Sequence, residues 1–166
     1  MTYKLTVKGL QEMQRGFNKS PQSVNKHAKT AMGKSVLYVL GESRKTAPVG
    51  VSGRLRNSMV SKVEGFGSRI TGRVGSSLTE IYPLAVEHGR KPGRMPPPSA
   101  LERWVHIVLH VPTAQALSVA FVVARSIGKK GIRARPFLHN ALEGSRGAIN
   151  RFFNDALRAI VSDLRK

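Results

Sequence analysis

Two histidines are the residues of this sequence whose spacing first suggests metal chemistry. His106 and His110 are four residues apart, which could put both imidazoles on one face of a helix. The residue after His106 is Ile107, however, where the zinc-protease pattern requires a glutamate. We therefore expect a partly buried histidine pair near Trp104 and no metal site.

The carboxylates are no better placed for catalysis. Only nine Asp and Glu residues occur among 166, they are scattered singly, and only Glu80 and Glu87 share one predicted strand region. Paired carboxylates for acid–base work are therefore not indicated. The chain has no cysteine, and no serine lies in a Gly-x-Ser-x-Gly turn. Residues 28–35 end like a phosphate-binding loop but lack its first glycine and continue a helical pattern. The sequence predicts a protein that is not an enzyme and has no cofactor.

The side chains that dominate the chemistry of this chain are cationic. Twenty-eight Lys and Arg give a formal charge of +19, and the excess is spread along the chain instead of forming one tail. A folded surface of this charge attracts polyanions, of which nucleic acid is the commonest. The alternatives are idle, solvated loops or an acidic protein neighbour. The predicted contacts to DNA or a partner are Arg54, Arg56, Arg90, Lys91, Arg94, Lys129, Lys130, Arg133 and Arg135.

These cations must be positioned by one domain of residues 1–166, because 40% hydrophobic residues can build a core and no composition change separates two domains. Alternating apolar residues predict a strand at 2–8, and a short helix follows at 10–17. Ser20 and Pro21 predict the start of a long amphipathic helix that runs to about Lys45. Its apolar stripe is Val24, Ala28, Ala31, Met32, Ser35, Val36, Val39, Leu40 and Ser43.

The middle of the chain predicts β-structure. Residues 57–87 indicate a three-stranded antiparallel meander with a hairpin turn at 65–68. Residues 89–98 then predict a basic, stiff, proline-rich loop. The sheet should hold three or four strands.

Helices should complete the domain. Ser99 and Glu102 have the spacing of a capping box at the start of a helix. The next helix should bury Leu117, Ala120, Phe121, Ala124 and Ile127 and end at residues 128–131. The cleanest stripe predicts a C-terminal helix, and Gly144 and Gly147 leave open whether residues from 138 form a separate turn. The predicted fold is α+β, a small antiparallel sheet packed against a long N-terminal helix and a C-terminal helix.

Nothing in the sequence indicates a membrane protein. No signal peptide is visible at the N-terminus, and the most apolar window, residues 116–124, is about half of the ~20 residues that cross a bilayer. We expect a soluble protein without a membrane partner.

Three segments resemble one protein family when they are taken together. Residues 46–58 (TAPVGVSGRLRNS), 81–89 (IYPLAVEHG) and 131–142 (GIRARPFLHNAL) are similar to motifs of the tail-completion, or minor tail-component, family of lambda-like bacteriophages. Ser52 stands where the family usually has threonine, and His88 replaces its common aromatic residue. The resemblance gives structural roles to Gly53, Leu55, Tyr82, Glu87, Gly89, Pro136 and Phe137.

The resemblance implies a structural protein of the virion neck, made in the host cytoplasm. It would be a homo-oligomer, expected to be a six-fold ring, that contacts other neck and tail proteins and surrounds the passing viral DNA. An open sheet edge could pair with a neighbouring subunit. A tail-terminator ring and a non-specific DNA-binding accessory protein are the alternatives.

Overall fold

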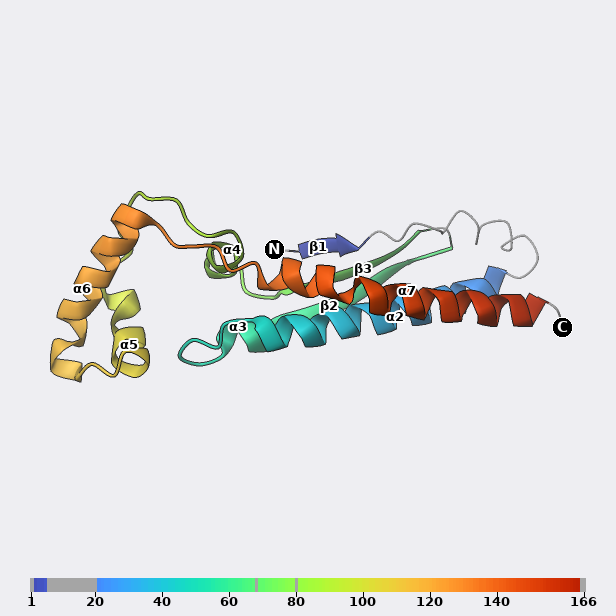
Figure 1. The fold of residues 1–166 in the computed structure, drawn as a ribbon, viewed down its shortest axis with the longest axis horizontal. Coiled ribbons are helices and arrows are strands. Elements are labelled where there is room, and N and C mark those ends of the chain that lie inside the picture. The colour runs from blue at the N-terminus through green and yellow to red at the C-terminus, as the bar shows by residue number, and fades with distance from the viewer. Residues whose placement is uncertain (1, 6–20, 68, 80, 165–166) are drawn as a thin grey trace. The chain divides into compact units, whose positions relative to one another are not determined.

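A computed structural model describes residues 2–5, 21–67, 69–79 and 81–164 (Figure 1). The predicted helix at 10–17, the end of the first strand, Ser20 and Glu80 lie outside these residues. The chain is α+β, as predicted, with an antiparallel sheet and a mainly helical backbone. It divides into two compact units. Unit 1 comprises residues 1–46, 59–77 and 138–166, and unit 2 comprises residues 47–58 and 78–137.

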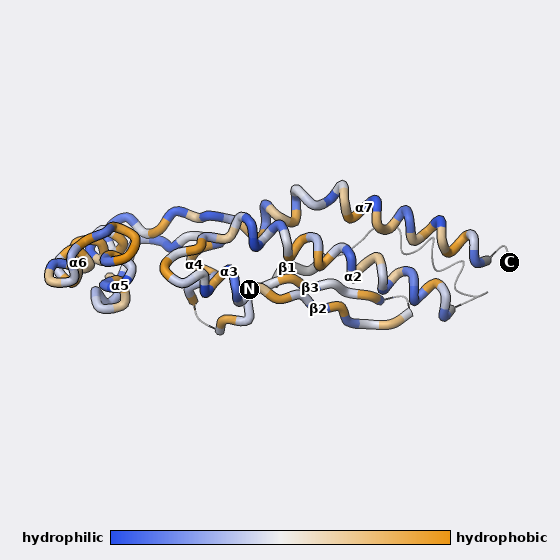
Figure 2. Tube along the Cα trace, turned by 90° about the horizontal axis from the view of Figure 1, so that it is seen from below, coloured by the Kyte–Doolittle hydropathy of each residue, from blue (hydrophilic) through white to orange (hydrophobic). Residues whose placement is uncertain are grey.

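Unit 1 combines a sheet with two long helices. Its strands are β1 (Thr2–Leu5), β2 (Met59–Phe66) and β3 (Arg69–Ser76), and its helices are α2 (Pro21–Thr46) and α7 (Phe137–Leu164). β3 pairs antiparallel with both other strands, so the strand order is β1-β3-β2. Figure 2 shows α2 and α7 on the same side of the sheet. The long N-terminal helix and the C-terminal helix occur where the sequence predicts them.

Helix α2 packs on β2 and β3 through the predicted stripe, all nine of whose residues are buried. The closest approach is at Gly72 of β3, where an added Cβ would lie 2.7 Å from the sulfur of Met32 and would also collide with Val36. A side chain at this position would push helix and sheet apart, because packed interiors have no room for added atoms. Gly72 therefore sets the distance between α2 and the sheet.

Helices α2 and α7 run side by side in opposite directions. Near one end, Asp163 of α7 accepts hydrogen bonds from the Ser23 hydroxyl at 2.7 Å and pairs with the His27 imidazole at 2.9 Å. Farther along, the rings of Tyr38 and Phe152 meet edge to face with centroids 6.1 Å apart. Because these contacts join residues more than 110 positions apart, α7 completes a core that α2 begins.

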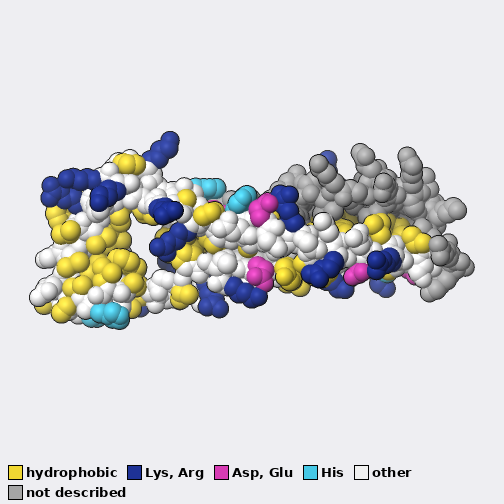
Figure 3. Space-filling view, in the orientation of Figure 1, with side chains coloured by type: hydrophobic (Ala, Val, Ile, Leu, Met, Phe, Trp, Pro, Cys, Tyr) yellow, Lys and Arg dark blue, Asp and Glu magenta, His cyan; other side chains and the backbone are white. Residues whose placement is uncertain are grey.

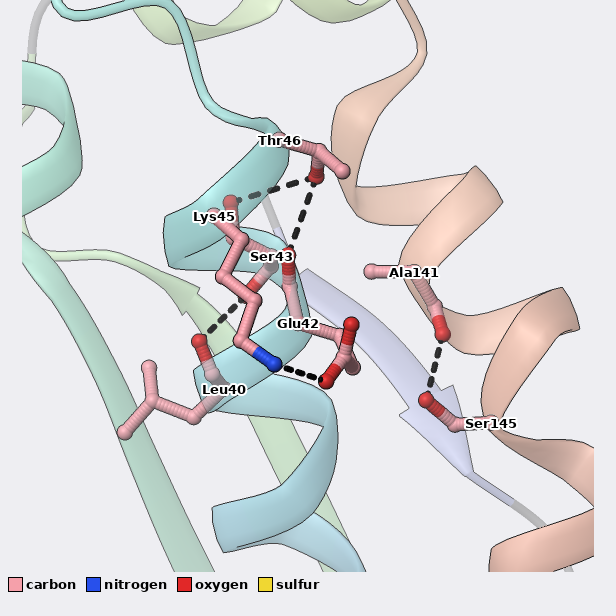
Figure 4. A network of polar contacts seen from close by, with 7 residues as sticks. All are labelled: Leu40, Glu42, Ser43, Lys45, Thr46, Ala141 and Ser145. Atoms are coloured by element: carbon pink, nitrogen blue, oxygen red, sulfur yellow. Dashed lines mark hydrogen bonds and ion pairs between the residues drawn. The ribbon is translucent and has the colours of Figure 1, made fainter.

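Figure 4 shows the end of α2 beside α7, with Ser43 on α2 and Ser145 on α7. The buried Ser43 and Ser145 hydroxyls donate to carbonyls of their own helices, at Leu40 (3.0 Å) and Ala141 (2.6 Å). This satisfies the hydroxyls without a partner from another element. On the exposed side, the hydrogen bond and charge of Glu42 raise the pKa of Lys45 above its usual value.

The face of the sheet that carries Glu64 holds a cluster of charged side chains. Glu64 on β2 pairs with Lys62 at 2.6 Å and with Arg73 of β3 at 3.0 Å. The hydrogen bond from Lys62, and then the charges of Lys62 and Arg73, hold the pKa of the Glu64 carboxyl below its ordinary value. The turn that follows is the predicted hairpin, with Gly65 and Gly67 at positive φ.

The predicted third strand of the meander is wrong. Residues 82–88 form helix α4 (Tyr82–His88), with Pro83 in its first turn and Gly89 at its C-cap. Proline suits the first turn of a helix and glycine its end. These signals outweigh the β-propensity of Ile81, Tyr82 and Val86.

Unit 2 is otherwise built from α3 (Arg54–Asn57), α5 (Ser99–Val108) and α6 (Thr113–Lys130). α5 and α6 lie side by side, and Val105, Ala116 and Ala120 form the core between them (Figure 1). The capping box is wrong, because Pro98 is the N-cap of α5, Ser99 is already helical, and no side chain caps the helix. The helix itself is where the sequence predicts it.

The prediction for the buried face of α6 is only partly right. Ala116, Ala120 and Ala124 are buried, but Leu117 and Phe121 are exposed. The small alanine side chains let α5 approach closely, whereas Leu117 and Phe121 remain exposed. The C-terminal helix is continuous through Gly144 and Gly147, so no separate turn precedes it.

Within the described residues, no single helix is long and apolar enough to cross a membrane. α5 and α6 meet that criterion only as a pair, and the chain bends by 116° between them.

Candidate polyanion-binding surface

All nine cations that the sequence nominates belong to unit 2. Unit 2 contains eleven Lys and Arg against three Glu, so it is strongly basic by itself. Eight of the nine side chains are exposed, and that of Arg90 is partly buried. The nominated residues are therefore available to an external anion.

The structure joins two basic segments that the sequence leaves apart. Arg90 and Ile132 form an antiparallel β-bridge in which each amide donates to the other residue's carbonyl, at 2.9 and 2.8 Å. The Gly93 amide donates to the Gly128 carbonyl at 2.8 Å, one step farther along. Residues 90–94 and 129–135 thus form one structure, which we call the basic loop pair. It carries Arg90, Lys91, Arg94, Lys129, Lys130, Arg133 and Arg135.

Two glycines make this pairing sterically feasible. Gly89 has φ 75° and ψ −176°, a conformation that is essentially restricted to glycine. An added Cβ at Gly89 would lie 2.6 Å from the Ile132 carbonyl oxygen and 2.8 Å from the Ala134 nitrogen. Gly131, also at φ 75°, would meet the Pro92 nitrogen at 3.0 Å and the Arg90 carbonyl oxygen more closely still. Side chains at either position would separate the two loops.

The cations of the basic loop pair are largely uncompensated. Among the described residues, no ion pair involves Lys91, Arg94, Lys129, Lys130, Arg133 or Arg135. Arg90 differs, because its guanidinium donates to the carbonyl of Arg94 and so helps to shape its own loop. Free cations beside glycine-rich backbone can bind phosphate groups by charge and by N–H donation.

Arg54 and Arg56 lie apart from this pairing in the hydrogen-bond scheme. Both are on the short helix α3, with exposed side chains on either side of the buried Leu55. Gly53 precedes them at φ 64°, and its amide donates to the Val49 carbonyl at 2.8 Å. The backbone hydrogen bonds that join the basic loop pair do not include α3.

The residues nominated by the family resemblance all belong to unit 2, where backbone contacts link the segments that carry them. The Arg135 amide donates to the Val86 carbonyl at 2.8 Å, which ties the second resembling segment to the third. The first segment approaches the second at Gly50, where an added Cβ would lie 3.7 Å from the Tyr82 hydroxyl. The remaining nominated residues are mainly interior: Leu55, Glu87 and Phe137 are buried and Pro136 is half-buried. No buried side-chain nitrogen or oxygen in the described part of the chain lacks a hydrogen-bond partner.

The predicted partly buried histidine pair near Trp104 is wrong. α5 ends at Val108, so His110 lies beyond the helix, at φ 55°. Both side chains are exposed instead of partly buried, and Nδ1 of His106 lies 2.7 Å from the Val111 carbonyl oxygen. Within the described residues, no three His, Cys, Asp or Glu side chains come close enough to hold a metal ion.

Comparisons with protein-family models, with curated protein sequences and with solved structures give no match to this chain.

Sequence reasoning nominated the cations but missed that residues 90–94 and 129–135 are one site. The available signal was a pair of glycines, Gly89 and Gly131, each beside one cationic segment. A pairing between segments some 40 residues apart depends on tertiary structure, which local pattern does not encode.

Proposed function

We propose that this protein is a structural protein of a bacteriophage neck, acting as a ring-forming tail-completion or head–tail joining protein. The observation that carries the proposal is that the parts of the three resembling segments that belong to unit 2, residues 47–58, 81–89 and 131–137, approach one another. They are far apart in sequence, yet the Arg135–Val86 hydrogen bond and the approach of Gly50 to Tyr82 link them. Because these approaches link the three segments in space, their joint resemblance to the family is more specific than a match to three separate short motifs.

The frame of the proposed subunit is a sheet of three or four strands packed against the two long helices. β2 is an edge strand in the order β1-β3-β2, so its outer backbone groups can pair with a neighbouring subunit. Head-to-tail contacts of this kind make a ring if the rotation closes. We expect six copies.

The basic loop pair gives this ring a polyanion-binding element. Its exposed cations can contact DNA phosphates without reading base sequence. The same observation favours the second candidate, a non-specific DNA-binding accessory protein of the virion. The proposed protein has no catalytic role, and a tail terminator would share its fold and ring.

Inactivation of the gene in the parent phage tests the proposal. The lysate is examined by electron microscopy, and the control is the same mutant complemented with the wild-type gene. Filled heads beside finished, unattached tails are the expected result for a joining protein. Tails of uncontrolled length would transfer the role to a terminator, and intact infectious particles would eliminate the neck function in favour of a DNA-binding accessory.

A further inference from the structure

The charges of the basic loop pair come from two segments that face each other across a β-bridge. Residues 90–94 contribute three cations, and residues 129–135 contribute four. Figure 3 shows Lys and Arg side chains gathered where α6 ends. Among the described residues, the backbone contacts that join the two segments are the bridge between Arg90 and Ile132 and one further hydrogen bond. A few backbone hydrogen bonds therefore hold two segments of like charge together.

The chain around the basic loop pair holds almost no carboxylate that could offset these charges. Between Glu87 and Glu143, the only acidic residue is Glu102. In the described part of the chain, Glu102 forms no ion pair with a cation of the basic loop pair. Like charges on paired segments repel each other over about 10 Å at 0.1 M salt. The pairing of the two segments is therefore opposed by the repulsion between their own cations.

Nucleic acid fits this charge pattern better than an acidic protein does. Protein–protein interfaces have a core that is depleted of charged residues, whereas protein–DNA interfaces are strongly positive. The basic loop pair carries four Arg and three Lys and no carboxylate. Duplex DNA presents one negative charge for about every 1.7 Å of its length. Cations of both segments can therefore meet the same run of phosphates.

The pairing determines how many cations one DNA molecule can meet at once. When the bridge is closed, both segments act on the same phosphates, and when it is open, one segment offers only three or four cations. Each phosphate contact adds to the affinity for DNA, so the closed pair binds DNA more tightly than the open pair. A ligand that prefers one of two states shifts the equilibrium towards that state, and the coupling is reciprocal. DNA binding and closure of the bridge should therefore stabilise each other.

We propose that duplex DNA binds across both segments of the basic loop pair and thereby stabilises the closed bridge between Arg90 and Ile132. The inference rests on the proposed function, in which this element contacts DNA, and adds that its backbone conformation responds to DNA. Two uncharged residues, Gly89 and Gly131, then become determinants of DNA affinity. Both have φ 75°, and an added Cβ at either position would collide with the backbone of the opposite segment.

Hydrogen exchange of the wild-type protein tests the coupling directly. The amides of Arg90 and Ile132 each donate across the bridge, so their exchange rates report how often the bridge opens. A saturating amount of mixed-sequence duplex DNA at about 50 mM NaCl should slow the exchange of both amides at least about tenfold. The reference is the Leu109 amide, which donates to the Val105 carbonyl at 3.1 Å in an uncharged part of unit 2. Its exchange rate should not change.

Salt should act in opposite directions with and without DNA. Without DNA, raising NaCl from about 50 to about 200 mM screens the repulsion between the two segments and should slow exchange of the bridge amides. With DNA, the same rise weakens the phosphate contacts and should speed exchange of these amides. Poly-glutamate at the same concentration of charge should protect the bridge amides less than the duplex does.

Gly89→Ala tests the reciprocal effect without removing a charge. Because the bridge cannot close, one segment should no longer contribute to binding. The affinity for duplex DNA should fall at least about tenfold, and the slope of log affinity against log salt should flatten by about 3. Gly93→Ala is the matched control, because an added Cβ there meets nothing within 4 Å, and it should keep the wild-type affinity and slope. Circular dichroism verifies that both variants are folded, and the exchange experiment on the wild type needs no variant.

Three results would overturn the proposal. The first is that DNA leaves the exchange of the bridge amides unchanged or slows the Leu109 amide equally. The second is equal DNA affinity of folded Gly89→Ala and Gly93→Ala, and the third is stronger protection by poly-glutamate, which would assign the site to an acidic protein. These measurements use the purified protein and do not depend on the head and tail phenotype of the gene-inactivated phage, so failure of the coupling and failure of the neck function are distinguishable.

Discussion

Substitution of Gly89 by alanine should open the basic loop pair. Alanine at φ 75° and ψ −176° costs about 1–3 kcal/mol in backbone strain. Its Cβ would lie 2.6 Å from the Ile132 carbonyl oxygen, so the bridge between Arg90 and Ile132 must separate. Two backbone hydrogen bonds are then lost, at about 0.5–1.5 kcal/mol each. The combined destabilisation of this region is about 2–6 kcal/mol.

Gly93→Ala is the matched control for this prediction. It lies in the same loop, and an added Cβ there meets nothing within 4 Å. We expect Gly93→Ala to leave stability unchanged or to raise it by up to about 1 kcal/mol. The assays are urea unfolding and hydrogen exchange of the Arg90 and Ile132 amides, which the bridge protects. If Gly89→Ala unfolds like Gly93→Ala and both amides keep their protection, the steric reasoning about the basic loop pair is refuted.

Three further predictions concern the core, the sheet and the cations. Phe153 is 7% exposed, so Phe153→Ala should cost ~3–5 kcal/mol in chemical denaturation, while Leu157→Ala, at a partly open site, should cost clearly less; equal costs would contradict the core assignment. Because the pKa of Glu64 is lowered, its ion pairs stabilise the fold above pH 4.5 and are lost as the pH falls through the lowered value; the difference in Tm between wild type and Glu64→Gln should therefore shrink below pH 4.5, and a difference that persists in acid would exclude this cause. Lys91→Glu combined with Arg94→Glu should leave unfolding within about 0.5 kcal/mol of wild type and flatten the slope of log affinity for duplex DNA against log salt by about 2; an unchanged slope would remove these residues from DNA contact.

The long helices could be predicted from sequence because their signals are local. Every residue of the predicted α2 stripe is buried, since a period near 3.6 together with Pro21 defines one face of a helix. The same reasoning failed at residues 82–88, where β-propensity pointed to a strand. There, Pro83 and Gly89 at the two ends decide the structure in favour of a helix.

The candidate site was predictable in composition but not in geometry. Charge and glycine content nominated the cations of both loops. The pairing of the two loops depends on the β-bridge between Arg90 and Ile132, which are 42 positions apart. This bridge requires positive φ at Gly89 and Gly131. The buried face of α6 was only partly predicted for a similar reason, because periodicity alone cannot tell which of its apolar residues meet α5.

The way α7 completes unit 1 has a consequence for synthesis in the cell. The partners of Asp163 are Ser23 and His27, so these contacts can form only after synthesis has passed Asp163. Unit 2 ends at Phe137 and emerges earlier, with its own core between α5 and α6 already available. Until α7 has been synthesised, part of the apolar surface of α2 stays exposed. The contacts between α2 and α7 also require closure of a long chain segment, which slows their formation. A chain that terminates before Phe137 would lack α7, and the core of unit 1 would then lose the contacts that α7 makes with α2.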